Sequence, residues 1–597
     1  ADDICRNVFI LQAHMFCRMD FGKEVDWTRV IDKDMESRVW MNAHPWMWTL
    51  VNAYRDTHDD KYVKHLCRLF LSWYNASPVT FQRTNAQWRT LEAGNRVGQK
   101  WTAVLLALSG HPQFKRECLY FMARSMYDHG RYLSMYAAGG GNWLQVESSG
   151  LACVALLFPE FKLSPTFYGV AMRRLAQVNE HAFLPDGFQS ECSPGYHYFP
   201  LMGMAGALRL ANHLDQPVPA SFMQQYEKAV EAVQWIAYPD RTLPMLSDFN
   251  PGRPSAVEGF QTGAEVFGRK DFQWFGSNGQ QGQPPSETSH DFTHSGYCVM
   301  RDKWGPDGQV LIFDAGYFGA GHQHEDKLNF VLYAGGRELI GDPGIYSYKC
   351  DEFEPYWRGS WSHNTMTVDG LSQLRARGPA EVIPDPDRRF VQGKGFDFAE
   401  GWYRHVYGLR GAQVWKSYQN TNTVHQVSVV NDVQHQRCVF YVKGRYAVVC
   451  DRAVGTGEHQ LDILFHPAPV ISGSGLQPVI RPVALTVRGD HSVVTVEKEA
   501  ANVAILPARG RDLEVLDLIG QKDPVRGWFA VCGIQPSHDI VYRWRGQLPR
   551  HFETVVQPLL GDKAKPMVVE ARPVTCRGSQ TCSAVACGSD LFLLSYD

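Results

Sequence analysis

The residue types best suited to metal binding and acid–base chemistry gather in one stretch near the middle of the chain. His322 and His324 stand two residues apart in the segment 321–326 (GHQHED), between two predicted strands. Side chains two apart on an extended segment point to the same side, so both rings can face one cavity. Asp342 and His363 follow in two further polar segments. A histidine, an aspartate and a second histidine from neighbouring strands form a ligand set that suits Zn²⁺. Each side chain taken singly also fits a hydrogen-bonded turn, but their clustering favours a shared site.

Three polar segments in the first half of the chain contain further residue types that bind ligands. They are residues 90–96 (TLEAGNR), 139–147 (GGGNWLQVE) and 186–198 (DGFQSECSPGYHY). Three consecutive glycines before Asn142 would let the backbone approach a ligand closely. The segment 186–198 lies between two apolar helical stretches, and its Gly and Pro are equally typical of a simple connection between helices. We expect all three segments to be loops, and their residue types alone assign them no function.

The first half of the chain carries the apolar spacing of paired helices. In residues 48–73, apolar side chains recur at helical spacing on both sides of the polar turn 57–60, which predicts two antiparallel helices joined by a short loop. The same pattern returns in residues 101–127, 149–180 and 199–238, at intervals of roughly 45–60 residues. The repetition predicts a solenoid or a ring of helical hairpins.

From about residue 286 the apolar residues alternate with a period of two, which predicts strands. Strands are expected at 310–314, 329–333, 439–442, 446–451, 493–496 and 503–506. Gly, Pro and Asp separate them at short intervals, a pattern typical of antiparallel sheets packed face to face. We therefore expect an α+β multidomain protein with a helical domain at residues 1–285, a β-sandwich domain at residues 286–526 and a small β unit at residues 527–597.

Composition excludes several classes of protein. The net charge of −3 lacks the basic excess of proteins that coat nucleic acid, so we expect no nucleic-acid partner. No apolar run approaches the ~18 residues of a membrane-spanning helix. Phosphate-binding glycine motifs, a GxSxG motif and CxxC pairs are also missing from the sequence. The sequence begins with Ala1, and we expect a mature form whose export signal has been removed, in the periplasm or outside the cell.

Together, these segments resemble the heparinase II/III group of polysaccharide lyases. The matching motifs are residues 321–324 (GHQH), 341–348 (GDPGIYSY), 362–370 (SHNTMTVDG), 142–143 (NW) and 186–197 (DGFQSECSPGYH). The resemblance covers essentially the whole chain. It implies an (α/α) toroid of helical hairpins followed by stacked antiparallel β-sheets. Chain length and the Asn at position 142 are most similar to heparinase III, a heparan sulfate lyase, whereas relatives use His near that position.

The resemblance also implies a reaction, which is β-elimination at a uronic acid. The enzyme removes the proton on C5, next to the carboxylate, and expels the O4 glycosidic oxygen. By the family match, Asn142 neutralises the carboxylate and so stabilises the charge that develops on the substrate. Tyr196 protonates the leaving oxygen and can also abstract the proton, and His322 is the second candidate base.

Further site residues follow from the same resemblance, with an anionic polysaccharide as the partner. Those expected to bind substrate are Arg96, Trp143, Glu147, Glu191, Arg358 and Trp361. Those expected to bind a structural zinc ion, which holds the sheet loops in place below the cleft, are His324, Asp342 and His363. Calcium in place of zinc would indicate an oxygen-rich site elsewhere.

Three alternatives to a glycosaminoglycan lyase are considered. The first is a lyase for alginate or another bacterial uronate polymer. The second is a glycoside hydrolase on the same helical scaffold, which needs two acidic residues across the cleft, and Glu147, Asp186 and Glu191 are available. The third is a noncatalytic carbohydrate-binding protein. The presence of Asn142 and Tyr196 together with His322 argues against the last two.

Overall fold

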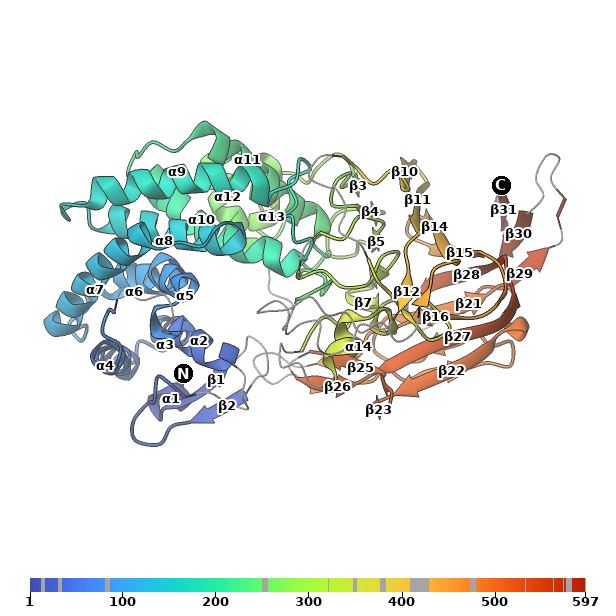
Figure 1. Cartoon of the computed structure of the whole chain (residues 1–597), viewed down its shortest axis with the longest axis horizontal. Coiled ribbons are helices and arrows are strands. Elements are labelled where there is room, and N and C mark those ends of the chain that lie inside the picture. The colour runs from blue at the N-terminus through green and yellow to red at the C-terminus, as the bar shows by residue number, and fades with distance from the viewer. Residues whose placement is uncertain are drawn as a thin grey trace.

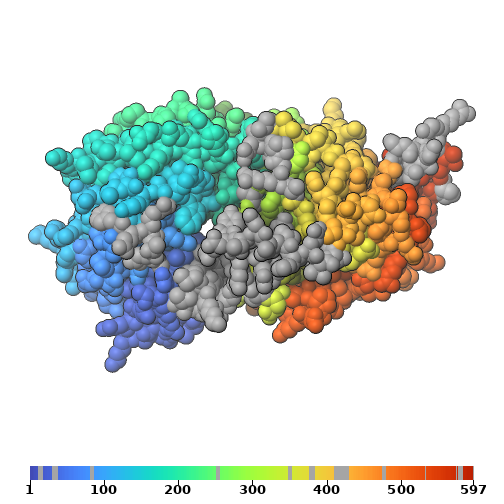
Figure 2. Space-filling view, viewed as in Figure 1, coloured from blue at the N-terminus to red at the C-terminus, as the bar shows by residue number. Residues whose placement is uncertain are grey.

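The protein consists of a helical half and a β half. A computed structural model describes residues 1–11, 17–29, 35–80, 86–249, 256–319, 321–346, 352–375, 383–408, 429–472, 479–531, 533–561, 563–572, 574–575 and 582–595. The helices occupy one side of the molecule and the sheets the other (Figure 1). In the space-filling view the two halves form adjoining lobes, blue to green for the helices and yellow to red for the sheets (Figure 2). In the described part of the chain, no helix is long and apolar enough to cross a membrane.

The helical half is built from hairpins, as the sequence predicts. Its helices are α1 (Asp2–Cys5), α2 (Met35–Asn42), α3 (Pro45–Thr57), α4 (Asp60–Ala76), α5 (Thr90–Asn95), the π-helical turn η2 (Arg96–Trp101), α6 (Thr102–Leu108), α7 (Arg116–Met135), α8 (Gly141–Leu157), α9 (Ser164–Ala182), α10 (Pro194–His213), α11 (Ala220–Ile236), α12 (Val257–Phe267) and α13 (Lys270–Gly276). A two-stranded hairpin, β1 (Val8–Leu11) with β2 (Cys17–Asp20), lies near the N-terminus.

The helices pack in two rows. Helices α3, α6, α8, α10 and α12 contact one another, together with η2, in an inner row, whereas α4, α7, α9 and α11 form an outer row. This double-layered arrangement is the one expected of an (α/α) toroid. The inner row is tight: a Cβ atom on Gly150 of α8 would lie 2.3 Å from the carbonyl oxygen of Gly94 in α5. Glycine at this position therefore allows α5 and α8 to touch backbone to backbone.

Three antiparallel sheets make up most of the β half. The five-stranded sheet has the order β3 (His290–Asp291), β4 (Tyr297–Arg301), β5 (Val310–Asp314), β6 (Phe330–Ala334), β7 (Arg337–Ile340). The eight-stranded sheet has the order β10 (Arg389–Gln392), β11 (Phe396–Tyr403), β14 (Gln434–Val442), β15 (Tyr446–Val454), β28 (Arg550–Leu559), β21 (Asn502–Pro507), β20 (Val493–Thr495), β19 (Leu485–Val487). The four-stranded sheet has the order β22 (Glu514–Ile519), β27 (His538–Gln547), β16 (Glu458–Phe465), β8 (Met366–Val368).

Shorter elements complete this half. They are α14 (Glu354–Arg358), the sheet of β9 (Ser372–Gln373), β12 (Tyr407–Gly408) and β13 (Val429–Val430), the pairs β17 (Val470–Ser472) with β18 (Val479–Arg481), β23 (Gln521–Lys522) with β24 (Val525–Arg526) and β25 (Trp528–Ala530) with β26 (Ile534–Pro536), and the sheet of β29 (Val569–Arg572), β30 (Cys582–Cys587) and β31 (Asp590–Ser595).

The five-stranded sheet packs against a different part of the protein on each of its two faces. One face of the five-stranded sheet, with Val299 and Ile312, joins the apolar core of the helical half. The opposite face, with Met300 and Phe313, shares a second core with the eight-stranded and four-stranded sheets. Because successive residues of a strand point to opposite faces, the same strands contribute to both cores. The five-stranded sheet is therefore the layer that joins the two halves, and its loops lie next to the helices.

The C-terminal segment differs from the expected separate unit at residues 527–597. Strand β28 lies between β15 and β21 inside the eight-stranded sheet, and β27 lies between β22 and β16. Among the described residues of this segment, β25 pairs with β26, and β29, β30 and β31 form a small sheet of their own. The expected boundary at residue 527 would therefore divide the two larger sheets, because strands from both sides of it pair with one another.

The three predicted loops also differ from the structure. Residues 90–96 form α5 and the start of η2, and α8 begins at Gly141, so Asn142 and Trp143 lie in a first helical turn. Similarly, α10 begins at Pro194 and includes Tyr196. The Ser193 side chain caps α10 by accepting a hydrogen bond from the Tyr196 backbone N–H, and proline suits the first helical position. The sequence predicted loops here because the first turns of these helices are rich in polar residues and glycine, which are also typical of loops.

Candidate active site

Two predicted catalytic residues from different halves of the protein meet face to face. Tyr196 lies in the first turn of α10, and His322 lies in the loop between β5 and β6. Their rings are stacked, with 3.6 Å between centroids and an interplanar angle of 12°. The His322 side chain keeps 26 % of its surface exposed, so the pair lies at the edge of the protein interior.

Asn142, the third predicted catalytic residue, is held by Glu191. Its Nδ2 donates to both carboxylate oxygens of Glu191, at 3.0 and 2.9 Å. The same carboxylate approaches His322, with 3.9 Å between Oε2 and Nε2. Glu191 therefore connects Asn142 to the stacked pair. The structure brings the three residues predicted to be catalytic into one cluster, although they lie far apart in the sequence.

The environment of Glu191 favours its neutral form. Burial raises the pKa of the Glu191 carboxyl, and this effect outweighs the nearby His322 and the hydrogen bond from Asn142, which act in the opposite direction. Helix α8 begins at Gly141, next to Asn142, and α10 begins at Pro194, three residues after Glu191. A negative charge is favoured at a helix N-terminus, so a substrate carboxylate would be stabilised at this place.

The loop that carries Glu191 is fixed from behind by buried residues. The Glu191 backbone N–H donates to Gln189 Oε1 at 2.7 Å, and the Gln189 N–H donates to Nδ1 of His197 at 2.9 Å. The other ring nitrogen of His197 donates to the Ala229 carbonyl oxygen at 2.8 Å. Burial lowers the pKa of His197 to about 4, so the ring is neutral at pH 7. A neutral ring can accept at Nδ1 and donate at Nε2, as both contacts require.

Asp248 is a site residue that the sequence analysis missed. Its carboxylate accepts hydrogen bonds from His322 Nδ1 at 2.7 Å, from Arg358 Nη2 at 2.7 Å and from His324 Nε2 at 2.8 Å. Burial by itself would raise the pKa of Asp248, but Arg358 and the two histidines outweigh it and leave the pKa well below its usual value. Histidines at such sites usually have a carboxylate partner, but nothing in the sequence selects one of the 62 acidic residues.

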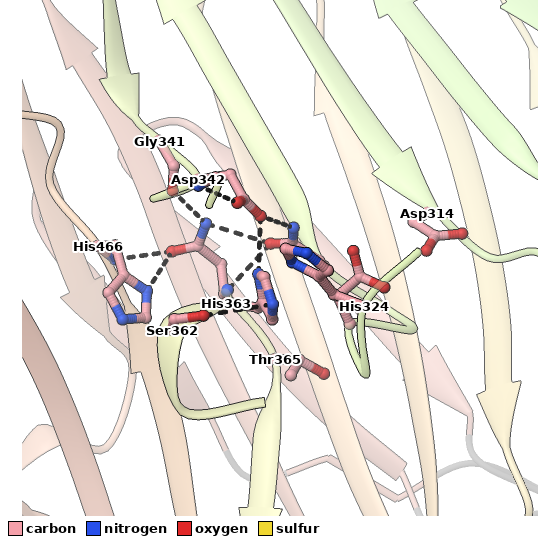
Figure 3. A network of polar contacts seen from close by, with 12 residues as sticks. Asp314, His324, Gly341, Asp342, Ser362, His363, Thr365 and His466 are labelled. Atoms are coloured by element: carbon pink, nitrogen blue, oxygen red, sulfur yellow. Dashed lines mark hydrogen bonds and ion pairs between the residues drawn. The ribbon is translucent and has the colours of Figure 1, made fainter. Parts of the chain in front are cut away.

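A candidate metal centre lies deeper in the β half. Asp326, Asp342 and His363 are buried, and one potential ligand atom from each lies within 4.8 Å of the others. His363 Nδ1 donates to Asp342 Oδ2 at 2.8 Å (Figure 3). Asn329 donates to the same oxygen at 2.7 Å. Burial raises the pKa of Asp326 to about 7. A bound cation would offset the cost of burying these acidic groups.

The predicted ligand set is supported in part. Asp342 and His363 are in the cluster, whereas its third member is Asp326, which the sequence analysis did not select. His324 lies beside the cluster, with 5.2 Å between its ring centroid and that of His363. Within the described part of the chain, Nδ1 of His324 is buried and has no hydrogen-bond partner. This nitrogen and the carboxylates fit a metal ion, so His324 remains a candidate ligand.

Of the residues predicted to bind substrate, Trp143 has the placement expected of a contact. It is 36 % exposed and follows Asn142 in the first turn of α8. The Arg89 guanidinium lies over its ring at 4.8 Å and also pairs with Glu92 at 2.6 Å. An exposed indole next to Asn142 can stack on a sugar ring. Trp361 is half-buried, and its indole nitrogen donates to the Gly370 carbonyl oxygen at 3.0 Å.

The predictions for Arg96 and Glu147 are wrong, because both side chains lie in the interior of the helical half. Arg96 is fully buried: its guanidinium lies 4.4 Å from the ring centroid of Trp73 and donates to His129 Nε2 at 3.1 Å. Burial lowers its pKa to about 9. Glu147 is also fully buried, and its Oε2 accepts from the Ala138 backbone N–H at 2.8 Å. Burial of these side chains between helices leaves neither available to a polysaccharide.

Arg358 has a different role from the one predicted. It is 6 % exposed, and besides Asp248 it contacts the Gly321 carbonyl oxygen, at 3.1 Å from Nη1. Its guanidinium therefore neutralises Asp248 and holds the loop that carries His322. Residues 347 and 348 of the predicted motif 341–348 lie outside the described residues.

Comparison with known proteins agrees with this architecture. Two family models match consecutive parts of the chain: "Heparinase II/III N-terminus" over residues 4–274 and "Heparinase II/III-like, C-terminal" over residues 284–535. The chain therefore belongs to the heparinase II/III family. The resemblance stated from the sequence motifs is confirmed.

Individual relatives are distant. A heparin-sulfate lyase of Pedobacter heparinus is 25 % identical over 455 residues, covering 74 % of this chain and 64 % of that protein, which is less than two thirds of its length. A heparin-sulfate lyase of Bacteroides stercoris is 23 % identical over 533 residues, covering 85 % of this chain and 73 % of the relative.

Solved structures show the same fold. The crystal structure of a heparinase III superimposes with a TM-score of 0.72 at 20 % identity, covering 96 % of this chain and 85 % of that one. The heparan sulfate lyase HepC of Pedobacter heparinus gives a TM-score of 0.62 at 21 % identity, covering 100 % of this chain and 88 % of that one. The expected order of a helical domain followed by antiparallel sheets is confirmed.

Proposed function

We propose that the protein is a polysaccharide lyase that cleaves heparan sulfate or a similar glycosaminoglycan by β-elimination at glucuronate. The observation that carries the proposal is the cluster of Asn142, Tyr196 and His322, joined through Glu191. Membership of the heparinase II/III family and the names of the heparin-sulfate lyase relatives support the same substrate class.

The residues divide the reaction as follows. The Asn142 amide binds the uronate carboxylate and stabilises the negative charge that develops on it when C5 loses its proton. Tyr196 takes the C5 proton and returns it to the O4 oxygen as the glycosidic bond breaks. His322, stacked on Tyr196, adjusts the proton affinity of the phenol and is the second candidate base. The product is an oligosaccharide with a C4=C5 double bond at its new non-reducing end.

The contact between Tyr196 and His322 supports glucuronate as the substrate. A sugar ring between two flat side chains needs two van der Waals contacts of ~3.5–4.0 Å each, or about 7 Å in total. The centroids are 3.6 Å apart, so the two residues act from the same side of the sugar. In glucuronate, the C5 proton and the O4 leaving group lie on one face of the ring, and one tyrosine can serve both. In iduronate and guluronate they lie on opposite faces.

The metal centre would be structural. The mixed nitrogen and oxygen donors of His363, Asp342, Asp326 and His324 suit zinc better than calcium, which takes six to eight oxygen ligands. When bound, the ion would hold together the loops before β6, after β7 and before β8. We also propose a periplasmic or secreted location, because extracellular glycosaminoglycans are too large to cross a membrane unaided.

A lyase for alginate or another uronate polymer is the second candidate, because the cluster recognises a uronate carboxylate and the relatives are only 23–25 % identical. A glycoside hydrolase is less well supported. Glu147 is buried, and Asp186 is occupied by hydrogen bonds from the backbone of His294 and Ser295, at 2.9 and 2.7 Å. Of the three acidic candidates, only Glu191 is in the cluster.

The test is incubation of the protein with heparan sulfate, heparin and alginate while ultraviolet absorbance and reducing ends are recorded. Elimination produces a conjugated C4=C5 double bond that absorbs in the ultraviolet, whereas hydrolysis produces reducing ends alone. We expect the chromophore with glucuronate-rich heparan sulfate. Reducing ends without the chromophore would refute the lyase proposal, and a chromophore with alginate alone would move the protein to the second candidate.

A further inference from the structure

Asp248 connects two histidines that serve different parts of the site. Its carboxylate accepts from Nδ1 of His322 and from Nε2 of His324, at 2.7 and 2.8 Å. Asp248 is 1 % exposed, and its backbone N–H donates to the His322 carbonyl oxygen at 2.8 Å. The segment around Asp248 and the loop that carries both histidines are therefore joined by main chain and by side chain.

The third contact of Asp248 sets its charge. Arg358 Nη2 lies 2.7 Å from Oδ2 of the same carboxylate, and a guanidinium can only donate. A carboxylate that receives three donors beside a fixed positive charge is ionised and can only accept. Both histidine nitrogens that touch it must therefore carry a hydrogen.

The two histidines contact the carboxylate through different nitrogens, so in their neutral forms they are opposite tautomers. In His322 the hydrogen is on Nδ1, which places the lone pair on Nε2, the nitrogen on the Glu191 side of the ring at 3.9 Å from Oε2. In His324 the hydrogen is on Nε2, which places the lone pair on Nδ1. That nitrogen is buried and, among the described residues, has no hydrogen-bond partner, as expected of a metal ligand.

We propose that Asp248 is a positioning residue that fixes both tautomers, so that one carboxylate directs His322 Nε2 toward the substrate and His324 Nδ1 toward the metal centre. The part that concerns substrate rests on the proposed function, whereas the tautomers and the metal do not. Asp248 would thereby link metal binding to the orientation of the catalytic histidine. The sequence contains the pair as residues 322 and 324, but the shared partner lies 74 residues before the first of them.

The test compares Asp248→Asn with a matched control. Asparagine has almost the same shape but offers one acceptor oxygen and one donor NH₂, so at least one histidine must change tautomer or lose its contact. The control is Asp451→Asn. Asp451 is also a buried carboxylate that accepts from a histidine, His435 at 2.6 Å, and from an arginine, Arg437 at 2.7 Å, and it contacts neither His322 nor His324.

Two readouts do not depend on catalysis. The first is ¹⁵N-histidine NMR, in which the shifts of protonated and lone-pair ring nitrogens differ, with His322→Gln and His324→Gln used for assignment. The second is the affinity for zinc alone, measured by competition with a chelator. For Asp248→Asn we expect a changed tautomer at one of the two histidines and zinc binding weaker by about 10–100-fold. Turnover should fall through kcat rather than KM, and the control should match the wild type in all three measurements.

The wild type alone can overturn the proposal. A spectrum with the hydrogen on Nε2 of His322, or on Nδ1 of His324 in the metal-free protein, would contradict it even if Asp248→Asn failed to fold. Unchanged tautomers and zinc affinity in folded Asp248→Asn would also contradict it. Activity decides a separate question: if the wild type cleaves no uronate polymer, the proposed function fails, while the NMR and zinc measurements still decide the role of Asp248.

Discussion

The hydrogen bonds between Asn142 and Glu191 give the sharpest test of the catalytic cluster. The perturbation is Glu191→Ala, alone and combined with Asn142→Ala. In the wild type, Glu191 fixes the orientation of the Asn142 amide through two contacts, at 3.0 and 2.9 Å. Removal of the carboxylate leaves the amide free to turn away from the position in which it would bind a uronate carboxylate.

The size of the effect follows from the strength of such contacts. Because burial favours the neutral form of Glu191, each of the two hydrogen bonds should contribute about 0.5–1.5 kcal/mol, or about 1–3 kcal/mol for the pair. Since 1.4 kcal/mol corresponds to a factor of ten in rate, turnover should fall by about 10–100-fold. In the Asn142→Ala background the same Glu191→Ala change should cost little, because the amide that Glu191 holds is already missing.

The assay is the initial rate of ultraviolet absorbance increase on saturating heparan sulfate for the wild type, both single variants and the double variant. Thermal unfolding of each variant checks that the fold is retained, and Glu160→Ala, on the surface of the helical half, is the control. The double-mutant cycle isolates the coupling between the two residues. Strictly additive losses would refute the reasoning, because they would mean that Glu191 acts on the reaction without Asn142.

Three further predictions concern other parts of the protein. Tyr196→Phe removes one hydroxyl and should lower turnover on heparan sulfate by about 10²–10⁴-fold with an unchanged melting temperature, and near-native turnover would remove Tyr196 from the mechanism. Burial lowers the pKa of His197 from 6.5 to about 4, so between these pH values the unfolded chain binds a proton that the native protein does not. The free energy of unfolding should therefore fall by about 3 kcal/mol as the pH drops from 6.5 to 4. Denaturant unfolding should show a shallower pH dependence for His197→Gln than for the wild type. Gly150→Ala should lower the melting temperature, because overpacking costs about 1–3 kcal/mol. The control is Gly169→Ala on the exposed face of α9, where no atom lies within 4 Å of the new Cβ, and it should leave the melting temperature unchanged or raise it. Equal melting temperatures for the two variants would contradict the close contact of α5 with α8.

Much of the architecture could be predicted from the sequence because the signals are local. The spacing of apolar residues along 48–73 is a property of one stretch of chain, and it corresponds to α3 and α4. The same holds for alternation along 310–314, which is β5, and along 446–451, which lies in β15. The motif around His322 also indicated the site, since two histidines on one short segment must lie close together.

The tertiary structure alone decided which side chains meet and which are buried. Asn142 pairs with a glutamate 49 residues away, and His322 with Asp248, and neither partner has a local signal. Arg96 and Glu147 have the residue types of a binding site, yet packing between helices removes both from solvent. A sequence records residue types and short-range spacing, whereas burial and hydrogen-bond partners depend on which distant elements pack together, and those contacts exist only in the folded chain.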